Sequence, residues 1–185
     1  MTIFKKYNEF LSEMQIPSGK WVDVDMSKLD KEAEDLIWKM YTDTYSKEGL
    51  DFSADDSSEL KTKYKATYLK DVDADHQPDA FIIYKETVYG NKIALLGTND
   101  KKGAKRDLIS KVIELVNKKG WFIEASKRME EILVDSKVPV IDDFEVIQNI
   151  VGKQKQPQME ADGYYSRFLS KAGKRIIKRI YGKLK

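Results

Sequence analysis

Residues 92–126, which read KIALLGTND, KKGAKRDLISKVIELVNKKG and WFIEAS, decide the fold. The middle part places apolar residues at spacings of three, four and seven, the pattern of a helix with one buried face. The apolar runs on either side are too short for helices and are rich in Ile, Leu, Phe and Trp, so we expect two strands. A helix between two such strands makes them parallel neighbours through a right-handed crossover. The segment therefore predicts a βαβ unit, with Gly120 ending the helix.

The loop that enters this helix has the features of an anion site. It reads Asp-Lys-Lys-Gly-Ala-Lys at residues 100–105. Unpaired N–H groups in the first turn of a helix, together with the positive end of the helix dipole, bind phosphate. Gly103 would let the backbone approach a ligand closely. Positive charge comes from Lys101, Lys102, Lys105 and Arg106. The pattern fits a phosphate site or an ordinary solvated loop, and Asp100 counts against the first because its carboxylate repels phosphate.

Length and composition place this chain in a broad class. A chain of 185 residues, 41% of them hydrophobic, has the length of one domain and can bury a sizeable core. No stretch approaches the roughly 18 apolar residues of a membrane span, and the N-terminal stretch lacks the apolar centre of a signal peptide. We therefore expect a soluble cytoplasmic protein with no membrane contact.

Metal and thiol chemistry have little support in the sequence. There is no cysteine, and His76 is the only histidine, so a disulfide framework, a thiol nucleophile, a Ser-His-Asp triad and a multi-histidine metal site are close to excluded. An acidic set lacks the glycine and distal glutamate of a calcium loop, so we predict no metal site there. This set comprises Asp71, Asp73, Asp75 and Asp79.

Positive charge is concentrated at the C-terminus. Residues 167–185 contain eight Lys or Arg and no acid, and since the whole chain has a formal charge of +2, the remainder carries about −6. Such a patch attracts nucleic acid, a phosphorylated cofactor or an acidic protein surface, and it can equally be a solvated end that keeps the protein soluble. The residues of this basic patch are Arg167, Lys171, Lys174, Arg175, Lys178 and Arg179.

Outside the βαβ segment, the chain reads as a single domain, 1–185, of helices and strands. Ser27 is the expected N-cap of a helix that Gly49 ends, and Gly90-Asn91 predicts a two-residue hairpin turn. The periodicity and turn signals predict, in order, an N-terminal helix within 1–19, a core at 20–152 with strands at 21–24, 65–73, 80–88 and 138–141 and helices at 54–64, 127–136 and 144–151, a loop at 153–162, and a basic hairpin at 163–185.

This order of elements resembles the GNAT N-acyltransferase fold over roughly residues 21–181. The resemblance rests on the order and on the basic loop, where Gly103 matches the central glycine of that family's phosphate-binding pattern and the flanking positions do not match. It implies an α+β fold with a mixed, mostly antiparallel central sheet flanked by helices and one βαβ crossover. It also implies acyl transfer to an amine with an acyl-coenzyme A donor such as acetyl-CoA.

The same resemblance implies where acetyl-CoA would bind. In that family the fourth and fifth strands splay apart, the backbone of the fourth strand pairs with the pantetheine arm, and the loop after it holds the pyrophosphate. The implied binding residues are Leu95, Leu96, Gly97, Lys101, Lys102, Gly103, Ala104 and Lys105.

Acyl transfer to an amine needs a base for the ammonium proton and an acid for the departing thiolate. Side chains alternate along a strand, so Glu124 and Ser126 point the same way on the fifth strand. Glu124 is the candidate base, and Ser126 could orient water or hydrogen-bond the thiolate. Each has an ordinary alternative, Glu124 at the solvated end of a strand and Ser126 as a helix N-cap. The next helix lacks the tyrosine acid common in the family, and Tyr164 and Tyr165 are the candidate substitutes.

Two function classes follow from these patterns. The first is an acyl-CoA-dependent N-acyltransferase that acts on an amine of an anionic substrate. The second is a non-catalytic module on the same scaffold that binds nucleic acid or an acidic protein partner through the basic patch. Aromatic residues interleaved with the patch would suit single-stranded nucleic acid, in which bases stack on aromatic rings and cations meet phosphates.

Overall fold

The computed structural model describes residues 19–29, 31–48, 55–64, 66–70, 78–99, 101–151, 166–169 and 175–185. The loop predicted at 153–162, and all but the last residue of the range predicted to hold an N-terminal helix, lie outside these residues. The elements are, in order, β1 (Trp21–Asp25), the 3-10 helix η1 (Met26–Lys28), α2 (Lys31–Glu48), α3 (Ser57–Lys63), β2 (Ala66–Lys70), β3 (Ala80–Thr87), β4 (Gly90–Thr98), α4 (Ala104–Val116), β5 (Trp121–Ala125), α5 (Lys127–Asp135), β6 (Val140–Ile141), α6 (Phe144–Val151), β7 (Ser166–Leu169) and β8 (Arg175–Lys183).

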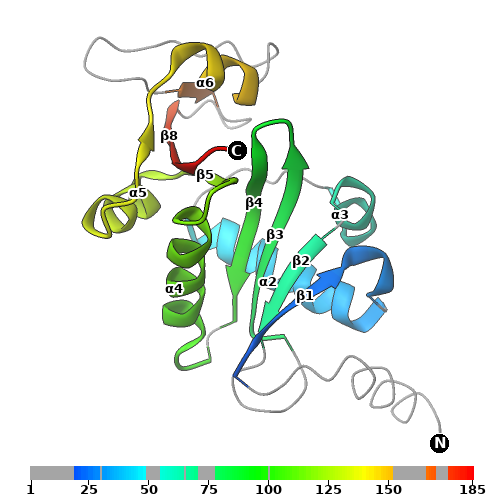
Figure 1. Cartoon of the computed structure of the whole chain (residues 1–185). Helices are drawn as coiled ribbons and strands as arrows, with labels where there is room; N and C mark the ends of the chain where they lie inside the picture. Colours follow the sequence, from blue (N-terminus) through cyan, green and yellow to red (C-terminus); the bar gives the residue numbers. More distant parts are fainter. Residues whose placement is uncertain are drawn as a thin grey trace, which may run out of the picture.

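The strands form a mixed sheet in the order β1-β2-β3-β4-β5-β8-β6, and β7 pairs with β8 (Figure 1). Strands β4 and β5 pair in parallel, and every other ladder between the described strands is antiparallel. Helix α4 connects the two parallel strands, so the predicted βαβ unit is confirmed. The predicted α+β class, with a mixed and mostly antiparallel sheet flanked by helices, is confirmed as well.

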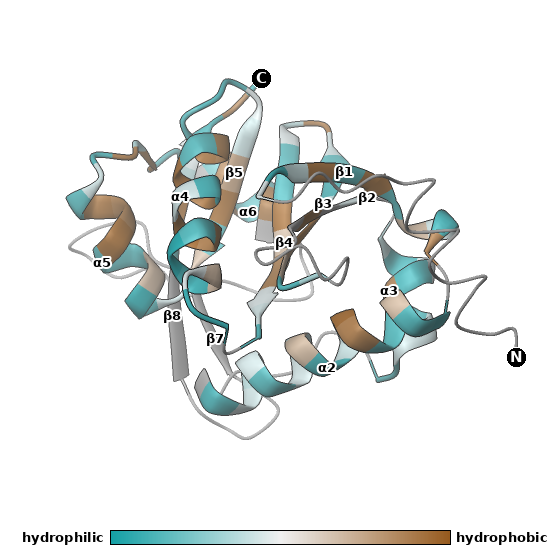
Figure 2. Cartoon of the chain, turned by 90° about the horizontal axis from the view of Figure 1, so that it is seen from below, coloured by the Kyte–Doolittle hydropathy of each residue, from teal (hydrophilic) through white to brown (hydrophobic). Residues whose placement is uncertain are grey.

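Helices cover both faces of the sheet because the strands alternate their buried side chains. On β3, Phe81 and Ile83 pack in a cluster with α2 and α3, whereas Ala80 and Ile82 pack in a second cluster with α4. Figure 2 shows hydrophobic colour along β1, β4 and β5 and much hydrophilic colour on α2 and α3. A third cluster joins α6 to strands β5, β6 and β8 through Phe122, Ile141, Ile147 and Ile180.

Two predicted helix signals act differently in the structure. Ser27 is not the N-cap of α2, because it lies in η1, where its backbone N–H donates to the side chain of Asp25 at 2.9 Å. Gly120 does not directly follow α4, which ends at Val116 with Asn117 as a right-handed C-cap. The backbone N–H of Gly120 donates instead to the carbonyl of Lys183 at 2.6 Å, which joins the start of β5 to β8.

The predicted hairpin turn is displaced by two residues. Thr87 and Gly90 face each other as a strand pair, so the turn consists of Val88 and Tyr89 rather than Gly90-Asn91. Gly90 has a φ of 127°, and a Cβ there would overlap the backbone of Gly120. Glycine is therefore needed at this position for the close approach of the chain that enters β5.

Candidate active site at the β4–β5 fork

Strands β4 and β5 pair over three residues and then separate. Their ladder joins Asn91–Ile93 to Trp121–Ile123, whereas β4 continues to Thr98. The last two residues of β5 pair on their other side with β8. We call the point where this ladder ends the β4–β5 fork. Beyond the fork, the β4 edge that faces β5 has no strand partner among the described residues.

A β-bulge coincides with the fork. Opposite β3, Ile83 pairs with Leu95 and Tyr84 pairs with Ile93, so Ala94 is the extra residue. Consecutive residues of a regular strand face opposite sides, but Ala94 and Leu95 both pack against the cluster under α2. A bulge bends its strand and increases the local twist. The bulge thus gives a physical reason why β4 leaves β5 directly after Ile93.

An ion pair lies at the fork. The Nζ of Lys92 on β4 donates to Oε1 of Glu124 on β5, and these residues neighbour the last ladder pair, Ile93 and Ile123. The two side chains are only 16% and 14% exposed. Glu124 is therefore not at a solvated strand end, and that ordinary reading of the candidate base is wrong. Its partner Lys92 was not singled out from the sequence, because the two residues are 32 positions apart.

Ser126 occupies the N-cap position of α5, which the sequence offered as its ordinary role. Its carbonyl accepts the N–H of Glu130 at 2.8 Å, which begins the helix. The Ser126 hydroxyl makes no capping hydrogen bond, and the side chain is half-buried. The residue thus stands two positions beyond Glu124 at the end of β5.

Helix α4 begins at the open end of the fork. Its N-cap, Gly103, has a left-handed backbone with a φ of 96°, and no heavy atom lies within 4 Å of where a Cβ would stand. Within the described residues, no acceptor meets the backbone N–H groups of Lys105 and Arg106, whereas Ala104 donates to the carbonyl of Lys101 at 3.2 Å. Asp100 itself is outside the described residues. The first turn of α4 therefore presents amides, next to the exposed lysine and arginine side chains at 102, 105 and 106.

Buried Asp79 organises the loop between β4 and α4. Its Oδ1 accepts from Asn99 Nδ2 at 2.5 Å and from Lys101 Nζ at 2.9 Å, and its carbonyl accepts from the N–H of Asn99 at 3.0 Å. Lys101 was predicted to add charge to the anion loop, but its ammonium is neutralised by Asp79 instead. The sequence interpretation had placed Asp79 only in an acidic set. An acid directly before the apolar strand AFII was the signal that could have revealed it.

A second polar cluster joins α5 to β8. The hydroxyl of Tyr181 donates to Oε1 of Glu130 at 2.8 Å, and Nε of Arg179 lies 3.7 Å from the same oxygen. Burial of Tyr181 and the carboxylate of Glu130 together raise the pKa of Tyr181 to about 12, so the phenol stays protonated and donates. The sequence interpretation did not single out this cluster.

The structure describes little of the predicted basic patch. Arg179 is 23% exposed and lies against Glu130, so it is not the solvated cation that the sequence suggested. Lys171, Lys174 and the tyrosines at 164 and 165 lie outside the described residues. The backbone of Arg167, Arg175 and Lys178 forms the paired strands β7 and β8, as the hairpin prediction required.

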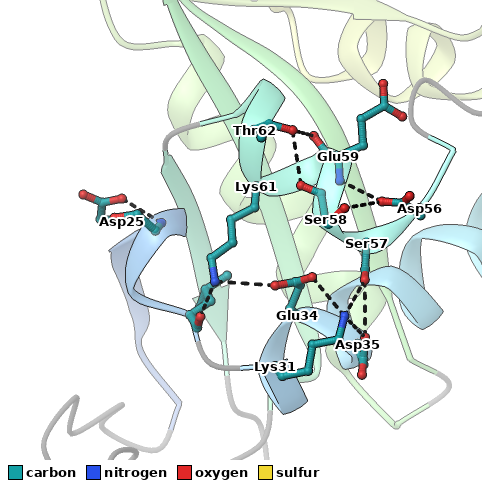
Figure 3. Close-up of polar contacts among 12 residues, drawn as sticks. Asp25, Lys31, Glu34, Asp35, Asp56, Ser57, Ser58, Glu59, Lys61 and Thr62 are labelled. Atoms are coloured by element: carbon teal, nitrogen blue, oxygen red, sulfur yellow. Dashed lines mark hydrogen bonds and ion pairs between the residues drawn. The ribbon is translucent and has the colours of Figure 1, made fainter.

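Another polar cluster, made of side chains from both helices, fixes α3 on α2 (Figure 3). Lys31 Nζ lies 3.1 Å from Glu34 Oε1 and 2.9 Å from the hydroxyl of Ser57, and Lys61 Nζ lies 3.5 Å from Glu34 Oε2. Burial alone would raise the pKa of Glu34. The hydrogen bonds from Lys31 and Ser57, together with the charges of Lys31 and Lys61, outweigh the effect of burial and hold that pKa below its usual value. Asp35 and Glu34 raise the pKa of Lys31, which makes its amine a poor base for activating Ser57. This cluster is therefore structural.

No protein-family model, no curated protein and no solved structure matches this chain. Among the described helices, none combines the length and apolar character needed to cross a bilayer.

Proposed function

We propose that this protein is an acyl-CoA-dependent N-acyltransferase of the GNAT type, with acetyl-CoA as a donor and the β4–β5 fork as its active site. The observation that carries the proposal is the fork itself. The parallel ladder stops after Ile93, β4 continues to Thr98, and among the described residues no side chain caps the helix that follows, which supports a donor site at this end of the sheet.

The donor would lie along β4 beyond the fork in an extended form. The five steps from Ile93 to Thr98 span about 17 Å at roughly 3.3 Å per residue. Along them, the free edge of β4 at Leu95, Leu96 and Gly97 offers N–H and C=O groups to an amide-containing arm. Gly97 also lets α2 and β3 pack closely behind this edge, because a Cβ would meet the ring of Phe81.

The residues at the start of α4 fit a diphosphate. The amides of Lys105 and Arg106 and the positive helix end favour an anion, and the left-handed Gly103 leaves open space beside them. Lys102, Lys105 and Arg106 supply cations, whereas Lys101 serves to hold the loop through Asp79. Acetyl-CoA, when bound, supplies the thioester whose acyl group is transferred.

The fork supplies a base for this transfer. Glu124 would accept a proton from the acceptor ammonium, and the neutral amine then attacks the thioester carbonyl. The C–N bond forms as the C–S bond breaks, and a proton goes to the leaving thiolate. Ser126, two residues further along, can donate a hydrogen bond to that sulfur. Lys92, which donates to Glu124, orients this carboxylate before the acceptor arrives.

Ligand binding tests the proposal without knowledge of the acceptor. Because a ligand that binds only the native state stabilises it by RT ln(1 + [L]/Kd), acetyl-CoA at 100 times Kd should add about 2.7 kcal/mol and raise the melting temperature. Lys105→Glu should weaken acetyl-CoA binding at least tenfold by calorimetry. Lys118→Glu, just beyond the other end of α4, is the matched control and should leave it unchanged. No melting shift at millimolar acetyl-CoA would refute the proposal.

A further inference from the structure

Strand β8 continues past the end of β5 as part of a two-stranded ribbon. Its ladder with β5 ends where Arg179 pairs with Ala125, and residues 175–178 pair with β7. Among the described strands, β7 has no partner other than β8, and residues 175–178 have none other than β7. We call residues 166–169 and 175–178 the β7–β8 ribbon. Two strands by themselves are only marginally stable in water, so contacts with a partner would stabilise this ribbon.

The strand register distributes positive charge over both faces of the β7–β8 ribbon. Directly paired residues of an antiparallel ladder share a face, and so do residues two apart along one strand. Arg167 pairs with Ile177, two residues from Arg175, so both arginines belong to one face. Lys178 pairs with Ser166 and belongs to the other face. The ribbon contains no acid, so nothing within it offsets these cations.

The start of α5 adds charge beside the ribbon. Ala125 pairs with Arg179 at the end of β5, and α5 begins two residues later with the exposed Lys127 and Arg128. Arg179 itself does not belong to this surface, because its side chain is 23% exposed and its Nε lies 3.7 Å from Oε1 of Glu130. The positive surface therefore consists of the β7–β8 ribbon and the first two residues of α5.

Two observations favour duplex DNA over other anionic partners. A flat acidic surface meets one face of a ribbon, whereas the major groove of B-DNA has phosphates on both sides and, at about 12 Å wide, admits a two-stranded ribbon. Single strands are bound through aromatic rings on which the bases stack. Tyr181, the aromatic residue of β8, is 1% exposed and donates to Glu130, so it cannot stack on a base.

We propose that the β7–β8 ribbon binds double-stranded DNA by entering its major groove. Arg167 and Arg175 would meet phosphates along one wall of the groove, and Lys178 those along the other. Lys127 would reach the adjacent DNA backbone from the start of α5. The apolar residues between the cations suit the thymine methyl groups that this groove exposes. This inference does not depend on the acyltransferase proposal, because it uses neither the fork nor α4.

Fluorescence anisotropy of the full chain with a short labelled DNA duplex tests the proposal in the absence of any acyl donor. The logarithm of the affinity should fall linearly with the logarithm of the salt concentration, with a slope of about −3.6 or steeper, which is roughly −0.9 for each of the four cations. The duplex should bind at least tenfold more tightly than either of its single strands, polyglutamate or anionic lipid vesicles at the same salt concentration. Absent or salt-insensitive binding, or equal affinity for any of these competitors, would overturn the inference.

A matched pair of double variants locates the binding on the ribbon. Arg175→Gln with Lys178→Gln removes one cation from each face, so the slope should shrink by about 1.8 and the affinity should fall at least tenfold. Lys28→Gln with Lys39→Gln removes two exposed cations from η1 and α2 and should change neither quantity. Thermal melting shows whether each variant is folded. If the ribbon variant unfolds, Lys127→Gln replaces it and should reduce the slope by about 0.9. An unchanged slope in the folded variant would also overturn the inference, and acetyl-CoA binding would then still stand or fall on its own test.

Discussion

Two glutamates in this molecule are nearly buried and paired with lysine, yet they lie in different settings. Glu34 is 7% exposed, lies between α2 and α3, and is held by Lys31 and Lys61. Glu124 lies at the β4–β5 fork with Lys92, next to a β4 edge that pairs with no other described strand beyond Ile93. Glu34 and its two lysines fill the contact between α2 and α3, and these helices pack on both sides of the cluster. The difference teaches that similar buried ion pairs can lie either inside a packed helix contact or beside the end of a strand ladder, and only the second lies in the site proposed for acyl transfer.

The strongest test of the difference between Glu124 and Glu34 is to neutralise each glutamate in turn. Glu124→Gln should lower the rate of acyl transfer about 10²- to 10⁴-fold, the usual contribution of a general base, with acetyl-CoA affinity unchanged. Glu34→Gln should leave the rate unchanged. Release of the coenzyme thiol, followed with a thiol reagent, measures both. Equal losses in the two variants would show that Glu124 acts through the fold alone.

The reverse contrast is expected in stability. Glu34→Gln should lower the free energy of unfolding by about 1–3 kcal/mol, because Lys31 and Lys61 lose a charged acceptor in a partly buried cluster. Urea denaturation at pH 7 measures the change. The control is Glu114→Gln, whose carboxylate is 48% exposed and which should cost less than about 0.5 kcal/mol.

Asp79 offers a test of the loop that follows the fork. Asp79→Asn keeps the side-chain shape and removes the charge that holds Lys101, so the protein should lose about 1–3 kcal/mol of stability. Because Asp79 also fixes Asn99 before α4, acetyl-CoA affinity should fall about tenfold, which is about 1.4 kcal/mol. Calorimetry on the folded variant checks the second effect. An unchanged affinity would separate the loop from the ligand path.

A smaller effect should appear in the pH dependence of stability. The pKa of Glu34 is lower in the folded protein than the value of about 4.3 in an unfolded chain. Its contribution is therefore fully present above that value and is lost as the pH falls through the folded-state pKa. Glu34→Gln should flatten the acid side of the stability profile, measured by urea denaturation between about pH 2 and 6. A profile parallel to that of the native chain would contradict this assignment.

The local pattern of residues 92–126 was sufficient to predict the βαβ unit, because apolar spacing and short-range turn chemistry fix a helix between two strands. The same reasoning failed at Gly90, since its role depends on Gly120, thirty residues later. It also placed Lys101 in the anion loop, because nothing local in the sequence reveals that buried Asp79 takes its charge.

The sequence by itself therefore determined the element order, the α+β class, the basic glycine loop and Glu124 as a candidate base. Only the tertiary structure decided that β4 leaves β5 at the Ala94 bulge and that Lys92 meets Glu124 at that point. The physical reason is the sequence distance over which each kind of interaction acts. Periodicity and turn signals act between neighbours in the chain, whereas strand register and ion pairing join residues that folding alone brings together.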